Sequence, residues 1–260
     1  MKVKDFRINN GVLEFCANDD SSIITIPEGV KTIGKEVFED FYRLRSVEMP
    51  NSVTHIEDWA FYICKDLKNV KMSNNINSIG EGAFAECVNL EDLIIPNSVK
   101  NIGEKAFAGC ESLKKISLPN SVEFIGNEAF EDCYALESVI IHDSVKKIGK
   151  GSFSGCKKLT IYYTGSETQW NEVANNDIKG IRTVFNFSNK EIRDKAVEGM
   201  SIHSSTSSNK ESANSYFEKV FHNTGKTLNF VINDMQKVGY SKSDIVSAVL
   251  NVLGNVNWND

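Results

Sequence analysis

Cysteine is the residue type in this sequence best suited to metal binding or nucleophilic chemistry, and five of the six cysteines recur with a 23-residue period. They are Cys64, Cys87, Cys110, Cys133 and Cys156. Protein metal sites usually take thiolates from close pairs such as C-x-x-C, and the sequence contains no such pair. Phe41 occupies the same position one period before Cys64, and a phenylalanine can neither ligate a metal nor form a thiolate. The spacing therefore predicts a row of buried, reduced thiols without a metal or a disulfide.

The other residue types that carry catalysis show no catalytic pattern. The four histidines have no common spacing, and neither an H-E-x-x-H motif nor a nucleophile–His–acid set is visible. Glycines such as Gly80 and Gly103 share the 23-residue period, which favours turn positions with positive φ over a phosphate-binding loop. Acidic pairs such as Glu39-Asp40 and Glu131-Asp132 are most simply solvated charge. We therefore expect a protein that is not an enzyme and that needs no cofactor or metal.

The elements that position these residues repeat with the same 23-residue period. One unit has the pattern L-x-x-I-x-I-P-x-S-V-x-x-I-G-x-x-A-F-x-x-C, and its phenylalanine recurs at Phe38, Phe61, Phe84, Phe107, Phe130 and Phe153. The L-x-x-I-x-I segment alternates as a half-buried strand does, and V-x-x-I-G predicts a second short extended segment. A-F-x-x-C places apolar side chains at helical spacing and predicts one or two helical turns. Identical units that stack align like residues into internal ladders, which supply the stability.

This unit resembles the leucine-rich repeats of the BspA type, which occur in bacterial and some protozoan proteins. The resemblance covers about residues 1–187 and implies an α/β repeat solenoid, a curved right-handed array of short strands and short helices. We expect a capping hairpin over 1–22 with a turn at Asn10-Gly11, six repeats over 23–160 and a C-terminal cap over 161–187. In that cap Ser166 and Gln169 predict a helix capping box, and Trp170 is expected to cover the last repeat.

Residues 188–260 lack the repeat and show helical spacing, which predicts a small α-helical module with a Ser-rich linker near 201–212. Eight Lys and Arg balance eight Asp and Glu in this segment, so the whole net charge of −6 falls on the solenoid. A module of this size has a marginal core. It is therefore expected to pack on the repeats, to pair with a second copy as a homo-oligomer, or to fold on a partner.

The charge and hydropathy of the chain narrow its partners. A net charge of −6 argues against nucleic-acid binding. No apolar run approaches the length of roughly 18 residues that a membrane span needs. The N-terminal lysines are not followed by the apolar segment of a signal peptide, and free thiols suit a reducing compartment. The sequence as it stands predicts a cytoplasmic protein. The alternative is a cell-surface or secreted protein whose export signal is missing from this sequence.

The outward positions of the L-x-x-I-x-I strand are the candidates for partner binding, because they vary while the core repeats. One column holds Glu48, Lys71, Ile94, Ser117 and Ile140, and its neighbour includes Asn69, Asp92 and Lys115. Ile94 and Ile140 are expected to be exposed apolar residues, with Lys71 and Lys115 as a polar rim. Trp59 and Tyr62 are aromatic exceptions on the predicted helical face, where they are either binding anchors or a local packing substitution.

These observations favour a non-enzymatic protein–protein interaction module. Its solenoid would recognise a protein partner, and its helical tail would recruit further proteins or self-associate. The alternative from another class is an adhesin-like leucine-rich repeat protein at the cell surface, which the resemblance supports. A third interpretation makes the array a spacer that presents an active segment within 188–260.

Overall fold

The 23-residue period corresponds to one coil of a solenoid of about seven turns. The computed structural model describes residues 5–17, 21–178 and 180–186. Contacts divide the chain into two units, Met1–Phe187 and Ser188–Asp260, and the solenoid with its caps belongs to the first. The predicted helical module and the Ser-rich linker near 201–212 lie outside the described residues.

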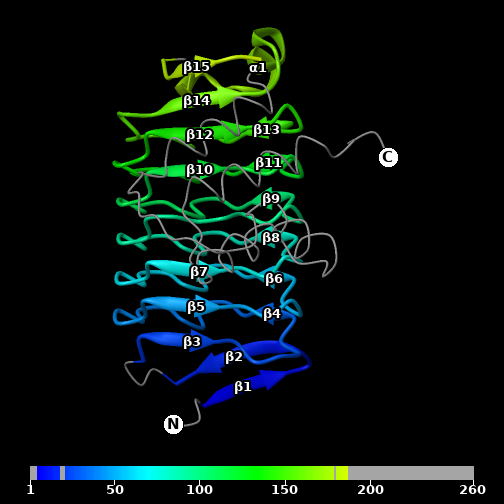
Figure 1. Cartoon of the computed structure of the whole chain (residues 1–260), viewed down its shortest axis with the longest axis vertical. Helices are drawn as coiled ribbons and strands as arrows, with labels where there is room; N and C mark the ends of the chain where they lie inside the picture. Colours follow the sequence, from blue (N-terminus) through cyan, green and yellow to red (C-terminus); the bar gives the residue numbers. More distant parts are fainter. Residues whose placement is uncertain (1–4, 18–20, 179, 187–260) are drawn as a thin grey trace, which may run out of the picture. The chain divides into compact units, whose positions relative to one another are not determined.

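The first extended segment of each coil lies on one side of the solenoid, here called the strand face, and it forms a strand in every coil except the one at residues 92–95 (Figure 1). Two parallel sheets make up this face. One consists of β3 (Ile23–Thr25), β5 (Ser46–Glu48) and β7 (Asn69–Lys71), and the other of β10 (Lys115–Ser117), β12 (Ser138–Ile141), β14 (Thr160–Tyr163) and β15 (Arg182–Val184). The register pairs equivalent residues of successive repeats, such as Val47 with Val70 and Ile116 with Val139.

The V-x-x-I-G segments form a second face, an eight-stranded sheet without interruption. Its two-residue strands are β4 (Thr32–Ile33), β6 (His55–Ile56), β8 (Ser78–Ile79), β9 (Asn101–Ile102), β11 (Phe124–Ile125) and β13 (Lys147–Ile148). An antiparallel hairpin of β1 (Phe6–Asn9) and β2 (Val12–Cys16) continues this sheet at the N-terminal end. Asn10 and Gly11 at its turn both have positive φ, as a two-residue hairpin turn of this kind requires.

The A-F-x-x-C segments form the third side, the turn face, and the helical turns predicted there are wrong. Between residues 21 and 163 the structure contains turns but no helix. The residues two before and two after each phenylalanine have positive φ, as at Trp59 and Ile63 around Phe61, so the backbone alternates in hand. The N–H of Phe61 donates to the carbonyl of Ala83 in the next coil at 2.8 Å, and this bond recurs from Phe38 to Phe130. A helix would keep that donor within its own segment.

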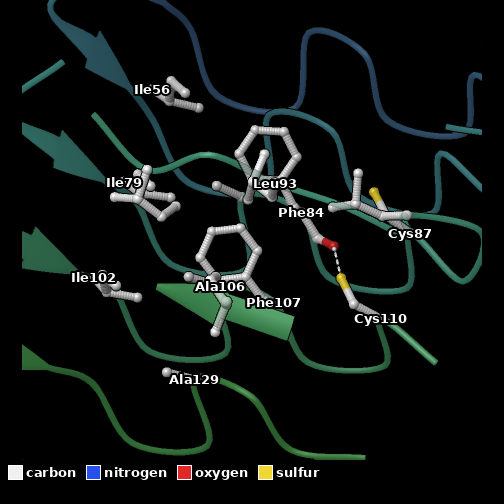
Figure 2. Close-up of a cluster of buried hydrophobic side chains, with 14 of the residues drawn as sticks. Ile56, Ile79, Phe84, Cys87, Leu93, Ile102, Ala106, Phe107, Cys110 and Ala129 are labelled. Atoms are coloured by element: carbon white, nitrogen blue, oxygen red, sulfur yellow. Dashed lines mark hydrogen bonds between the residues drawn. The ribbon is translucent and has the colours of Figure 1, made fainter. Parts of the chain in front are cut away.

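Stacked side chains fill the interior between the three faces. The phenylalanines form a continuous pile whose ring centroids lie 4.9–5.6 Å apart, and each ring is almost completely buried. Figure 2 shows two members of this pile, Phe84 and Phe107, with Cys110 beside them. Burying one such side chain contributes about 1.5–3 kcal/mol, so the pile is a major source of stability.

The glycine that follows each V-x-x-I segment is needed for a different reason from the one predicted. Gly80, Gly103, Gly126 and Gly149 do not have positive φ. A Cβ atom on Gly126 would instead lie 2.5 Å from the backbone nitrogen of Glu104 in the preceding coil. The position therefore requires glycine because two backbones approach closely. Glu57 is the exception, and its carboxylate accepts a hydrogen bond from the N–H of Lys35 in the coil before it at 3.0 Å.

The last coil is closed by α1 (Glu167–Val173) and the 3₁₀ helix η1 (Asn176–Ile178). Ser166 and Gln169 form the predicted capping box, and Trp170 of α1 is buried, as expected. The Asn175 amide donates to the carbonyl oxygens of Ile148 and Gly149, at 3.2 and 2.6 Å. These bonds take the place of a further coil and satisfy the end of the second face.

Candidate interaction surface

The recurring cysteines form a buried row inside the solenoid and do not form a reactive site. Each of the five thiols donates to the carbonyl oxygen of the phenylalanine 26 residues earlier, over 3.0–3.3 Å. Figure 2 shows one of these bonds, from Cys110 to Phe84. None of the six cysteines forms a disulfide, and burial raises the pKa of the Cys64 thiol to about 12. The thiolate that nucleophilic or metal chemistry needs is therefore disfavoured.

The described part of the chain contains neither a metal-ligand cluster nor a membrane-spanning helix. No three His, Cys, Asp or Glu side chains within it gather closely enough to hold a metal ion. The same residues include no helix with the length and hydrophobicity to cross a bilayer.

The strand face exposes most of the predicted partner-binding residues. Its first column, here called column A, presents Glu48, Lys71, Ile94 and Ser117, and its second, column B, presents Asn69, Asp92 and Lys115. Ile94 is 60% exposed, a high value for a large apolar side chain, and its exposure was predicted. Glu48 and Lys71 form an ion pair across adjacent strands. The face thus places an apolar side chain among charged and polar ones.

Ile140 does not share the exposure of Ile94, and its prediction as an exposed residue is wrong. Its side chain is only 9% exposed. The register places it between Ser117 of β10 and Tyr162 of β14, so an aromatic side chain lies directly beside it. An aromatic cross-strand neighbour covers far more of an isoleucine than a serine or lysine tip does. Column A therefore loses its C-terminal apolar member as a contact residue.

Trp59 and Tyr62 lie on the turn face, away from the two columns. Their rings meet edge to face with centroids 5.0 Å apart, and both side chains are half-buried. The indole lies so close to Gly82 of the next coil that any Cβ at residue 82 would clash with it. Gly82 and Ala85 are buried, although their positions face outward on this side of the solenoid. This geometry supports the local packing interpretation of the two aromatic residues.

Four exposed aromatic residues were not predicted from the sequence: Phe15, Tyr42, Phe124 and Tyr134. Phe124 stands on the second face, in a column whose other members are Thr32, His55, Ser78, Asn101 and Lys147. An aromatic exception in a polar column is the signal that singled out Trp59, and applied to this column it would have found Phe124.

Comparison with known proteins agrees with the repeat. The family model "BspA type Leucine rich repeat region" matches in six copies over residues 7–110 and 77–196. The sequence has no significant match among curated proteins.

Several solved structures resemble the chain. A leucine-rich repeat protein from Bacteroides ovatus shares 29% identity with a TM-score of 0.56, over 62% of this chain and 45% of its own. The leucine-rich repeat protein of T. pallidum shares 29% identity with a TM-score of 0.57, over 61% of this chain and 78% of its own. The pneumococcal vaccine antigen PcpA, at 20% identity and a TM-score of 0.59 over 69% of this chain and 45% of its own, shows the same fold. The chain thus spans less than half of the Bacteroides protein it matches.

Proposed function

Because the chain belongs to the family of BspA-type leucine-rich repeat proteins, we propose that it is a non-enzymatic module that recognises a protein partner through its strand face. The observation that carries this proposal is the contrast within one strand. Inward positions repeat the same apolar residue types from coil to coil, whereas the outward positions of columns A and B change in charge and size.

The composition of the strand face suits protein recognition. Protein interfaces commonly combine a small apolar centre with a polar rim, and a few anchor residues carry most of the affinity. Ile94 supplies the apolar centre, with Asp92 in its own coil. Lys71 and Lys115, one repeat to either side, supply the rim. Electrostatic complementarity to these charges would set the orientation of the partner.

The tail has a separate part in this proposal. Residues 188–260 would recruit a second protein or pair with a second copy of the chain, because their helical spacing and balanced charge predict a small module with a marginal core. Deleting them should leave partner binding by the solenoid intact and abolish any self-association, which analytical ultracentrifugation of both forms would measure.

The test of the strand face uses one disruptive and one matched control variant. A partner is first captured by cross-linking in native cells with the full chain, and its affinity is then measured by calorimetry. Ile94→Asp should weaken that affinity at least tenfold, because it places a charge at the apolar centre. Phe124→Asp, an equally disruptive change at an exposed residue of the second face, should leave the affinity within twofold. Unchanged affinity in Ile94→Asp would exclude the strand face.

The burial of the cysteines is compatible with the adhesin-like alternative. Free thiols argued against an oxidising, extracellular setting, but all six cysteines are buried and so are protected from oxidants there. The protein would then act at the cell surface with the same strand face toward a host or neighbouring cell. Labelling intact cells with a membrane-impermeant amine reagent separates the alternatives: modification of the exposed lysines supports the surface location, and protection until lysis supports the predicted cytoplasmic one.

A further inference from the structure

The hydrogen-bond ladder of the strand face is lost at residues 92–95, which keep only an isolated bridge from Asp92 to Lys115 toward the following coil. No backbone hydrogen bond joins residues 69–72 to residues 92–95, and the segment after Asp92 is not a strand. In Figure 1 no strand arrow stands between β7 and β10 on this face. The adjoining segments are joined here by side chains, through a hydrogen bond from the Asn89 amide to the Lys65 carbonyl and a 3.6 Å ion pair between Lys68 and Glu91. We call this place the seam.

The core is looser at the seam than at the other junctions of the strand face. Val70 is half-buried, although its equivalents Val47 and Val139 are completely buried. Met72 is 9% exposed, against 3% for the equivalent Met49. The rings of Phe84 and Phe107, in the coils on either side of the seam, lie 5.6 Å apart, the widest step in the pile.

The other two faces remain closed across the same pair of coils. On the second face β8 pairs with β9 in the regular register. On the turn face the N–H groups of Gly82 and Phe84 donate to the carbonyls of Glu104 and Ala106, both at 2.8 Å. The two coils are therefore tied along two of their three sides and untied along the third.

One inward residue distinguishes the interrupted coil from the others. The central position of the strand holds a β-branched residue in every other coil, at Ile24, Val47, Val70, Ile116, Val139 and Ile161. In the interrupted coil it holds Leu93. Leucine lacks the second branch at Cβ that favours extended backbone and packs well on a pleated surface. Most strands of this face are only three residues long, so the central residue contributes a large share of the pairing.

From these observations we propose that the seam is a hinge of the solenoid, with Leu93 as the residue that creates it. The ladders of the second and turn faces form the axis, and the strand face opens and closes. Bending at the seam changes the distance between the N-terminal and C-terminal halves of column A, so Glu48 and Ser117 move relative to each other. The hinge follows from the packing alone and does not depend on the proposed partner.

Hydrogen exchange of the full-length protein tests the seam directly. The N–H of Met49 donates across an intact junction to the carbonyl of Lys71 at 2.9 Å, whereas the equivalent N–H of Met72 has no backbone acceptor in the described coils. The amide of Met72 should therefore exchange at least tenfold faster than that of Met49. Equal protection of the two amides in the unmodified protein would overturn the proposal.

Two substitutions test the role of Leu93 in the same measurement. Leu93→Ile should restore the pairing and bring the exchange rate of the Met72 amide to within about twofold of that of Met49. Val47→Leu makes the reverse change at an intact junction, where the N–H of Ile26 donates to the carbonyl of Glu48 at 2.9 Å. It should speed the exchange of the Ile26 amide. Unchanged exchange in both variants would show that the residue at this position does not create the seam.

Spin-label distances test whether the seam bends. Labels on cysteines introduced at Glu48 and Ser117 span it on the strand face, and labels at His55 and Phe124 span the same three repeats on the second face. The native cysteines are buried and should not react with the label. The first pair should give the broader distance distribution, and Leu93→Ile should narrow it. Equal widths for the two pairs would show that the seam does not act as a hinge.

Discussion

Replacing Phe107 with alanine should remove one ring from the middle of the phenylalanine pile. The side chain is completely buried, with Phe84 on one side at 5.6 Å and Phe130 on the other at 5.3 Å. Substitutions of this kind in a packed core cost about 3–5 kcal/mol, since the lost burial is joined by the cavity left behind. The free energy of unfolding should fall by that amount.

The solenoid predicts how this loss is distributed along the chain. Each coil contacts its neighbours alone, so a cavity in the fourth repeat weakens the coupling between the coils before and after it. Trp59 lies in the second repeat and Trp170 in the C-terminal cap, which gives each half its own fluorescent reporter. In single-tryptophan versions of Phe107→Ala, the two urea transitions should separate, whereas they should coincide in the parent protein.

The matched control is Phe124→Ala, which makes the same chemical change at a side chain that is 43% exposed. Its cost should not exceed about 1 kcal/mol, and the two transitions should stay together. Similar losses of stability in both alanine variants, or one-step unfolding of Phe107→Ala at the parental urea concentration, would contradict the stabilising role of the pile.

Three further outcomes follow from the same packing. Gly126→Ala should lower the free energy of unfolding by about 1–3 kcal/mol, because its Cβ would lie 2.5 Å from the backbone of the preceding coil. Gly29→Ala, whose Cβ would meet nothing within 4 Å, should lower it only by the roughly 1–2 kcal/mol that a positive φ costs a residue with a side chain. Thermal denaturation measures both changes. Because the pKa of Cys64 is raised to about 12 in the folded protein, the unfolded chain loses the thiol proton at a lower pH than the folded protein does. The free energy of unfolding should therefore be at its full value below about pH 8.5 and fall as the pH rises toward 12, as urea titrations would show. Asn175→Ala should lower the free energy of unfolding by about 1–3 kcal/mol, because two carbonyl oxygens lose their hydrogen-bond donor. The urea midpoint reported by Trp170 should fall more than the midpoint reported by Trp59.

The stacking of the repeats could be predicted from the sequence because a fixed period places equivalent residues beside one another. Burial at the Ile, Phe, Leu and Cys positions follows from that alone. The capped helix start at Ser166 follows from a separate local signal, its spacing to Gln169. The path of the backbone between those positions could not be predicted in the same way. A-F-x-x-C directs its apolar side chains inward both in a helix and in a run of alternating turns, so the side-chain spacing cannot distinguish the two. The choice depends on where the N–H groups find acceptors, and here these lie in the next coil.

The strand face was predictable as a surface but not in its details. Alternation identified the outward columns, and Ile94 is exposed as expected. Ile140 differs because its neighbour Tyr162 belongs to the shortened last coil, where the 23-residue period no longer gives the register. The seam could have been suspected from Leu93 among β-branched residues. Its effect on pairing depends on the whole junction, which the sequence of one strand does not describe.

The three faces differ in how freely their outward residues can change. On the turn face, two positions in each coil require positive φ, and each substitution there acts on backbone strain as well as on the surface. On the strand face, the ladder and the inward residues carry the stability. The outward side chains interact with one another mainly through exposed ion pairs, such as Glu48 with Lys71 and Lys68 with Glu91. Such pairs contribute at most about 1 kcal/mol each. Column A and column B can therefore vary at little cost in stability, which is the property a recognition surface needs if one scaffold is to be adapted to different partners.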